Sequence, residues 1–380
     1  MNCVPNQNYA ILDTHILKWL RMQGYDAPKS TPSKNKYLKI EQIFLEEAKK
    51  RNKTPIELDL EIWLSYAKKQ EIEQLLIAFL VQGNCLLEGD AGTGKSLLAE
   101  QFAACLGLHY QRVALSPDLE IPELVDQLDR DAEEPTTLAA NVLLVEGIDY
   151  ASPKLQTLLV DLPSRGVIRA SRESFQFRRP LMLLASHNLL NAAPLRLRSS
   201  HADQFLFEIP FGYPKYEVEY GIVDASLPTT VQAEPPIGID ATSARLAIQA
   251  MQVPPPIVHY ALRLVRSTRV YEGEDHDFVL EFVQHGAGLR AAESLVVAAK
   301  ARAVLHDRPV PTADDVRSLV RVVLRHRIVL NANAAKNGVT VDPLLDRLLA
   351  ETPERVPGDD SAPGGYRQND RASLHDQPHQ

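Results

Sequence analysis

The sequence has few cysteines and no long apolar run. Its three cysteines, Cys3, Cys85 and Cys105, are far apart and lack the paired spacing of metal ligands, so they support neither a disulfide framework nor a structural zinc site. No stretch approaches the roughly 18 to 20 consecutive apolar residues of a membrane span. The first 30 residues lack the apolar core of a signal peptide, because Asp13 and Lys18 interrupt it. We therefore expect a soluble, cytoplasmic protein with no membrane association.

Lysine is scarce in most of the chain, and its distribution divides the sequence in two. Residues 1–69 hold 10 lysines, 2 arginines and 8 acidic residues, whereas residues 70–380 hold 5 lysines, 24 arginines and 41 acidic residues. Two segments of different origin joined near residue 70 would produce this change, and so would a solvated lysine-rich face on an ordinary domain. With 380 residues, of which 45% are apolar, the chain is long enough for two or three packed domains.

A glycine-rich segment stands between a predicted strand and a predicted helix. Residues 71–80 have helical periodicity, with Ile72, Leu75, Leu76 and Leu80 on one face, and residues 84–88 form a short apolar strand. The next residues have the pattern G-x-x-x-x-G-K-S, and a helix follows from Lys95 to Leu106. This order is typical of a phosphate-binding loop.

The chemistry of such a loop requires these residue types. Glycines let the backbone wrap closely so that its N–H groups point inward, and the helix directs the positive end of its dipole at the phosphates. Lys95 would reach the β and γ phosphates, and the Ser96 hydroxyl would coordinate Mg²⁺. We therefore predict a nucleoside triphosphate and Mg²⁺ site formed by Gly89, Asp90, Ala91, Gly92, Thr93, Gly94, Lys95, Ser96 and Leu97.

Four further strand signals follow the loop. They lie at residues 110–115, 141–146, 181–186 and 204–210, and the stretches between them are long enough for crossover connections. Near-continuous apolar strands that alternate with helices predict a parallel sheet covered on both faces, with the ligand at the carboxyl ends of the strands. The predicted fold class is therefore α/β, with a five-stranded parallel sheet.

The rest of the chain has a helical pattern that ends before the C-terminus. Within residues 240–345 apolar side chains recur at helical spacings of three and four, and Thr312 has the pattern of a helix N-cap. We expect residues 216–253 to be a linker and the prolines at 254–256 to form a stiff connector. Residues 346–380 are predicted to be a mostly disordered tail, because large apolar residues are almost absent after residue 352.

Several short motifs in this part of the chain resemble the MoxR branch of the AAA+ ATPases. The resemblance covers about residues 70–345 and rests on the segments 84–96, 116–119, 153–156, 185–188, 204–207, 212–214, 286–291 and 323–330. It implies a nucleotide-binding αβ subdomain at residues 70–215, a C-terminal all-α lid at residues 254–345, and binding of ATP with Mg²⁺. It also implies a homo-oligomeric ring, commonly a hexamer, that assembles or activates partner complexes, often with a protein that carries a von Willebrand factor A domain.

The resemblance assigns roles to three further residues. Asn188 occupies the sensor-1 position, where a polar side chain positions the attacking water; the alternative is an amide that closes the end of a strand. Arg290 occupies the sensor-2 position, where paired N–H donors bridge the γ-phosphate to the lid; the alternative is a surface arginine. Glu146 stands in the place of the aspartate that holds the Mg²⁺ water shell.

Two positions depart from the family pattern, and both concern hydrolysis. Gly147 stands where the family has its catalytic glutamate, and Gln204 stands where the family has the arginine that acts on the neighbouring subunit's nucleotide. A lost base costs about 10²- to 10⁴-fold in rate and a lost arginine finger about 10³- to 10⁵-fold, so we expect impaired ATP hydrolysis. Possible replacements are Asp149, or Glu146 in a shifted register, for the carboxylate, and Arg196 or Arg198 for the arginine. Gln70 alone survives from the family's adenine-contacting segment.

The basic segment 1–69 has a helical pattern with a loop at residues 25–36. Its residues 11–20 resemble the aspartate-bearing helix of helix-hairpin-helix DNA glycosylases, whose carboxylate, Asp13 here, acts after base flipping. Only twelve residues precede Asp13, too few for the hairpin and its catalytic lysine, so we interpret Asp13 as a helix N-cap. A DNA-associated module is the alternative function. Nucleic acid is not the expected partner, because a charge of +4 is a small electrostatic footprint.

Overall fold

The structure is a computed structural model that describes two compact units. The units are Met1–Arg245 and Leu246–Gln380. The described residues are 17, 20–21, 23–27, 34–50, 69–131, 133–170, 172–188, 197–213, 241–270 and 276–354; of residues 34–37, 48 and 69 only the backbone is described.

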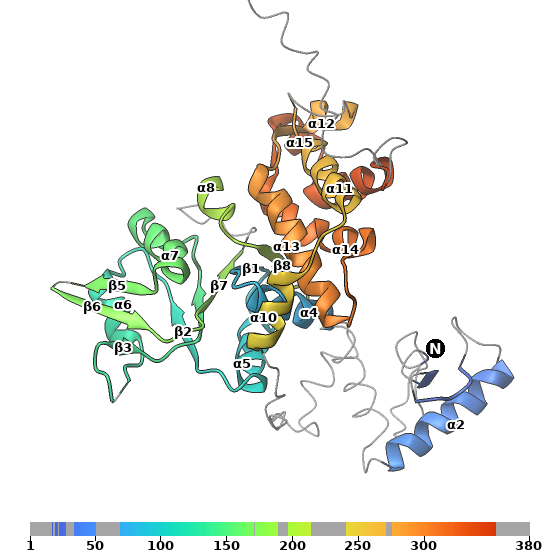
Figure 1. Cartoon of the computed structure of the whole chain (residues 1–380), viewed down its shortest axis with the longest axis horizontal. Helices are drawn as coiled ribbons and strands as arrows, with labels where there is room; N and C mark the ends of the chain where they lie inside the picture. Colours follow the sequence, from blue (N-terminus) through green and yellow to red (C-terminus); the bar gives the residue numbers. More distant parts are fainter. Residues whose placement is uncertain are drawn as a thin grey trace, which may run out of the picture. The chain divides into compact units, whose positions relative to one another are not determined.

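A five-stranded parallel sheet forms the centre of the first unit (Figure 1). Its strand order is β2-β4-β7-β1-β8, and each neighbouring pair is parallel. The predicted α/β fold with five parallel strands is confirmed. The strands are β1 (Cys85–Glu88), β2 (Tyr110–Ala114), β4 (Val142–Glu146), β7 (Met182–His187) and β8 (Phe207–Pro210).

The apolar strands are buried because helices cover the sheet. Leu143, Leu144, Leu183 and Leu184, on the neighbouring strands β4 and β7, are all fully buried. Burial of each such leucine contributes about 1.5–3 kcal/mol. The central strands therefore anchor the sheet, and their carboxyl ends place Glu146 and His187 at one edge.

The start of β8 differs from the prediction by three residues. The strand begins at Phe207 and not at Gln204, because the preceding residues form a turn after the short helix α8 (Ser199–Ala202). In this turn the Gln204 N–H donates to the His201 carbonyl and the Phe205 N–H donates to the Ala202 carbonyl. An apolar run marks a buried segment, and it does not separate a buried turn from a strand.

Residues 69–165 of the first unit include the helices α4 (Lys69–Leu80), α5 (Lys95–Cys105), α6 (Ile121–Gln127) and α7 (Pro153–Arg165). The predicted apolar face of α4 is partly wrong. Leu75 and Leu80 are buried, but Ile72 is 41% exposed, and Ile77, Ala78 and Phe79 are buried instead. The second half of α4 is therefore enclosed on more than one face, which a single-stripe pattern does not predict.

A second, three-stranded sheet was not predicted. It has the order β3-β6-β5 and contains β3 (Thr137–Leu138), β5 (Val167–Ala170) and β6 (Glu173–Phe177). β5 and β6 are antiparallel, and their inward side chains alternate with exposed ones. These strands are too short and too polar to give a strong periodic signal.

The second unit is helical, apart from a pair of short strands. Its longest helix, α13 (Leu289–Leu305), packs with α11 (Pro255–Arg266) and α14 (Ala313–Leu324). The other elements are α12 (Asp277–Phe282), β9 (Val283–His285), the 3₁₀ turn Arg325–Arg327, β10 (Val329–Leu330), α15 (Ala332–Lys336) and α16 (Val341–Glu351). Helix α10 (Ala241–Ala250) spans the boundary between the units and lies inside the range expected as a linker, and α16 extends into the range expected as a tail.

The prolines at 254–256 do not form a connector. Pro254 is the N-cap of α11, and Pro255 and Pro256 are its first helical residues. A proline fits the first turn of a helix because its fixed φ is helical and its missing N–H has no partner there in any case. The expectation of a stiff connector was therefore wrong.

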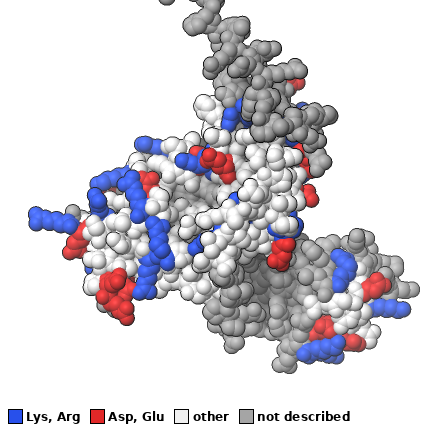
Figure 2. All heavy atoms as spheres, in the orientation of Figure 1, with Lys and Arg blue, Asp and Glu red and all other residues white. Residues whose placement is uncertain are grey.

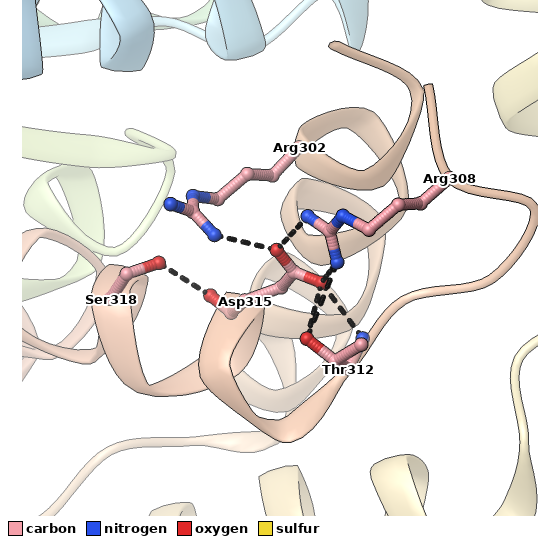
Figure 3. Close-up of polar contacts among 5 residues, drawn as sticks. All are labelled: Arg302, Arg308, Thr312, Asp315 and Ser318. Carbon is pink, nitrogen blue, oxygen red and sulfur yellow. Dashed lines mark hydrogen bonds and ion pairs between the residues drawn. The ribbon is translucent and has the colours of Figure 1, made fainter. Parts of the chain in front are cut away.

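A buried carboxylate joins α13 to α14 (Figure 3). Asp315 is fully buried and accepts hydrogen bonds from Arg302 Nη1 at 2.6 Å and from both Nη atoms of Arg308 at 2.5 Å. It also accepts from the Thr312 N–H and hydroxyl, each at 2.8 Å, which completes a capping box. The predicted N-cap at Thr312 is confirmed. Burial alone would raise the pKa of Asp315, but the bonds from Arg308, Thr312 and Arg302 hold it well below its usual range.

The described part of the front segment contains helix α2 (Lys34–Lys50). The helix begins at Lys34, so the last residues of the predicted loop at 25–36 belong to the helix. Tyr25 donates its hydroxyl to Glu47 Oε1 at 2.7 Å, and Lys50 Nζ donates to the same oxygen at 2.8 Å. Asp13 and the tail after residue 354 lie outside the described residues. None of the described helices is long and apolar enough to cross a membrane.

Candidate functional site

The loop between β1 and α5 has a backbone that only glycine tolerates at one key position. Gly89 has a φ of 147°, and a Cβ placed there would lie 2.3 Å from the carbonyl oxygen of Phe211. The chain is held this close because the Phe211 N–H donates to the Glu88 carbonyl at 2.7 Å. Gly94, with a φ of 88°, caps α5, and no side chain caps the start of this helix. Among the described residues, its first N–H groups therefore stay available for an anion.

Lys95 lies folded against the same loop. Its Nζ donates to the carbonyl oxygens of Gly89 and Asp90, both at 2.6 Å. Burial lowers the pKa of Lys95, whereas the negative charges of Glu146 and Asp90 oppose this shift. A phosphate that entered the loop would replace the carbonyl contacts and give the ammonium a full negative charge as its partner.

Two oxygen donors meet beside the loop. The Ser96 hydroxyl donates to Glu146 Oε1 at 2.5 Å, and Arg112 Nη2 donates to Glu146 Oε2 at 2.6 Å. Ser96 lies in the first turn of α5, Glu146 ends β4 and Arg112 lies on β2. Hydroxyl and carboxylate oxygens are the ligands that Mg²⁺ prefers. The predicted metal ligands Ser96 and Glu146 are thus brought together.

Asn188 contacts the loop as well. It follows β7, and its Nδ2 donates to Asp90 Oδ1 at 2.7 Å. The structure therefore brings this predicted site residue to the phosphate loop, as its place at a strand end suggested. Its role toward an attacking water stays a prediction.

The loop fits a nucleoside triphosphate with Mg²⁺. The cradle at Gly89 excludes a side chain, the helix start is uncapped, Lys95 turns inward, and Ser96 and Glu146 offer paired oxygen donors. Each feature favours an anion and a hard cation over an apolar ligand.

Comparison with known proteins identifies the family. The model described as "ATPase family associated with various cellular activities (AAA)" matches residues 84–207, and the model described as "AAA lid domain" matches residues 281–348. The chain is 29% identical over 291 residues to "Chaperone MoxR1" of Mycobacterium tuberculosis, which covers 74% of this chain and 76% of the relative. It is 26% identical over 311 residues to "Protein MoxR" of Paracoccus denitrificans, which covers 74% of this chain and 90% of the relative.

The chain belongs to the MoxR-type AAA+ ATPases. A crystal structure of a protein from Cytophaga hutchinsonii has the same fold, with a TM-score of 0.68 and 22% identity; the match covers 82% of this chain and 96% of that one. A 56-residue stretch, 15% of the chain, is 41% identical to part of "8-oxoguanine DNA glycosylase/AP lyase" of Picrophilus torridus, of which it covers 27%. The similarity to a glycosylase therefore concerns a short segment.

In this AAA+ ATPase the residue after Glu146 has an unusual backbone. Gly147 has a φ of 72°, a left-handed conformation, and its N–H donates to the Ser186 carbonyl at 3.0 Å. A Cβ there would lie 3.0 Å from the ring of Tyr150. The position therefore lacks a glutamate, and its backbone conformation and the nearby Tyr150 ring also disfavour one.

The suggested replacement Asp149 is buried, at 5% exposed. Burial raises the pKa of Asp149, opposed by its own N–H, by His187 and by the Asn188 N–H. Its Oδ1 has no hydrogen-bond partner within the part of the chain that the structure describes. The Asn188 N–H, directly after β7, is one of the groups that hydrogen-bond the Asp149 carboxylate.

A buried pair near this point was not predicted. His187 Nε2 lies 2.9 Å from Glu208 Oε1, and both side chains are about nine-tenths buried. Burial alone would lower the pKa of His187, but Glu208, then Glu88 and Asp149, raise it above its ordinary value of 6.5. The sequence offers only a histidine at the end of one strand and a glutamate within another, and the pairing depends on the strand order.

Four further residues that the sequence singled out, and that the structure describes, are exposed. Gln204 follows α8 and is exposed, and Arg198, the N-cap of α8, is exposed as well. Arg290 is the second residue of α13, in the second unit, and Gln70 is the second residue of α4. Arg196 lies outside the described residues. Their predicted roles stay predictions.

Proposed function

We propose that this chain is an ATP-binding subunit of a homo-oligomeric ring, commonly of six copies in its family, that acts as a chaperone or assembly factor for partner complexes. The observation that carries the proposal is the contact of Ser96 with Glu146 beside the loop that holds Lys95. The similarity to a protein named as a chaperone supports the cellular role. A protein with a von Willebrand factor A domain is a candidate partner.

Different residues would bind the phosphates and the metal ion. The loop N–H groups and Lys95 would hold the phosphates, and Ser96 with Glu146 would hold Mg²⁺, directly or through water. Bound Mg²⁺ neutralises charge on the phosphates. Asn188, fixed to Asp90 at 2.7 Å, would stay oriented at the loop beside the terminal phosphate. Arg290 is the candidate to report the nucleotide to the lid.

We further propose that hydrolysis is weak. Gly147 offers no carboxylate in a position that also disfavours one, and Gln204 is neutral where the family has an arginine. Loss of a base costs about 10²- to 10⁴-fold and loss of an arginine finger about 10³- to 10⁵-fold. Nucleotide binding, more than turnover, would then switch the state of the ring.

Phosphate release under Mg-ATP saturation tests this proposal. Wild type should turn over slowly, and the Gln204→Arg variant should be faster. Rapid wild-type turnover that Glu146→Gln abolishes would show an active ATPase and contradict the proposed weakness.

A DNA-associated function is the alternative, supported only by the short glycosylase-like stretch. It predicts salt-sensitive duplex binding that is lost when residues 1–69 are deleted. Absent or salt-insensitive binding would exclude it.

A further inference from the structure

A groove of about 580 Å³ lies on the first unit between α6, α7 and β5. It shares no lining residue with the phosphate loop, Glu146 or Asn188. Figure 2 shows basic side chains gathered as a band over the part of this unit that contains α7 and the β5–β6 hairpin. The chain as a whole is acidic, with a net charge of −8, so this local excess of cations is a specific feature of the surface.

The rim of the groove is cationic. Lys154 and Arg169 are exposed, and neither forms an ion pair within the residues that the structure describes. Arg165 is 71% exposed at its side chain and pairs with Asp161 at 2.8 Å. The alternation of β5 forces Arg169 outward, because Ile168 and Ala170 on either side are buried.

Lys154 is placed against the local electrostatics of its own helix. It is the second residue of α7, whose N-terminus carries the positive end of the helix dipole and has no acidic residue in its first turn. A cation at this end of a helix is unfavourable, because it faces the positive end of the dipole. An acidic group bound in the groove would compensate both Lys154 and the exposed helix start.

The floor of the groove is apolar. Ile121 and Leu158 are partly buried and pack against the main core of the unit, and Val167 lies beside them at the start of β5. These side chains offer an aliphatic ligand a surface that water now covers. The groove therefore combines an aliphatic floor with a rim of positive charge.

The same lining argues against nucleic acid. It contains no aromatic side chain on which a base could stack, and the Asp161 carboxylate would repel phosphates. A peptide suits it better, because its carboxylates can pair with the rim while an aliphatic side chain covers the floor. We propose that this groove binds a segment of a partner protein in which acidic residues flank aliphatic ones.

Fluorescence anisotropy of a labelled peptide tests the proposal. The probe is a peptide of alternating glutamate and leucine, titrated with the full chain in the absence of nucleotide. The double variant Lys154→Glu/Arg169→Glu should bind it about ten-fold or more weakly, since each exposed charge contributes up to about 1 kcal/mol. Both side chains are exposed, so the variant should fold, and an unchanged thermal melt verifies this.

Three controls make the result specific. Lys336→Glu reverses an exposed lysine on α15, in the other unit, and should leave peptide binding unchanged. A peptide with glutamine in place of glutamate tests the charge, and one with serine in place of leucine tests the floor; both should bind more weakly. Equal binding by wild type and double variant would overturn the proposal. So would equal binding of the glutamine peptide, or tighter binding of a single-stranded oligonucleotide that the double variant loses.

Discussion

The Ser96 hydroxyl lies 2.5 Å from Glu146 Oε1, although fifty residues separate them in sequence. The parallel sheet produces this contact, because the helix after β1 starts at the same edge at which β4 ends. Arg112 holds the second oxygen of Glu146, so the carboxylate is fixed from two sides. A longer acidic side chain than the family's aspartate is thereby kept at the place where Mg²⁺ would bind.

The Mg²⁺ dependence of nucleotide binding should report this contact. In Ser96→Ala or Glu146→Gln, the Mg²⁺ concentration that half-saturates binding of a fluorescent ATP analogue should rise about 10- to 100-fold. The effects should be less than additive in the double variant, because both residues serve one ion. Ser164→Ala, at an exposed serine, is the matched control. Mg²⁺-independent binding by wild type would contradict the assignment.

Restoring a glutamate at position 147 should fail to restore catalysis. The left-handed backbone of Gly147 costs an L-residue about 1–2 kcal/mol, and its Cβ would press on Tyr150. Gly147→Glu should therefore lower the free energy of unfolding without a large gain in phosphate release. Gly147→Ala imposes the same backbone strain and should be destabilised similarly. A gain of about 100-fold in turnover, with an unchanged melt, would show that the position accommodates a base.

The His187–Glu208 pair should make stability depend on pH. Because the pKa of His187 is raised in the folded state, its stabilising contribution is complete below its ordinary value of 6.5 and is lost as the pH rises through the folded pKa. Chemical denaturation at pH values from below 6.5 to above the folded pKa should show that the free energy of unfolding of wild type falls by about 1–3 kcal/mol, as for a hydrogen bond to a charged group. The dependence should be smaller in Glu208→Gln. Identical pH profiles for the two proteins would contradict this prediction.

The stability of the lid should depend on the Asp315 carboxylate. Asp315→Asn leaves Arg302 and Arg308 without their charged partner and should cost about 3–5 kcal/mol. The pKa of Asp315 is lowered, so its contribution is present above its ordinary value of 3.8 and is lost as the pH falls below it. The exposed neighbour Asp314 is the matched control, since Asp314→Asn should cost well under about 1 kcal/mol. Equal urea midpoints for both variants would contradict the network's importance.

Local patterns predicted the elements that carry the site. The apolar runs at β1, β4 and β7 predicted buried parallel strands, and the glycine spacing predicted the loop. These signals are visible because each depends on neighbours in sequence: burial of a whole strand and a backbone turn that needs glycine.

Pairings across the sheet could not be predicted in the same way. His187 and Glu208 lie on β7 and β8, which are separated by β1, so their contact depends on the strand order. The β5–β6 hairpin was missed because its strands are short and half polar. The N-cap at Thr312 followed from the sequence, but the part of Asp315 in a capping box did not. Arg302 reaches Asp315 through the packing of α13 on α14, and Arg308 reaches it from the connection between these helices.

Calorimetric titration of the full chain with Mg-ATP tests the central claim most directly. Wild type should bind one nucleotide per chain, and Lys95→Ala, which removes the ammonium held at Gly89 and Asp90, should weaken binding by about 100-fold or more while the melt in the absence of nucleotide stays close to that of wild type. If folded wild type gave no binding heat at several temperatures with adenine or guanine nucleotides and Mg²⁺ at saturating concentrations, the assignment of this loop to a triphosphate would be wrong.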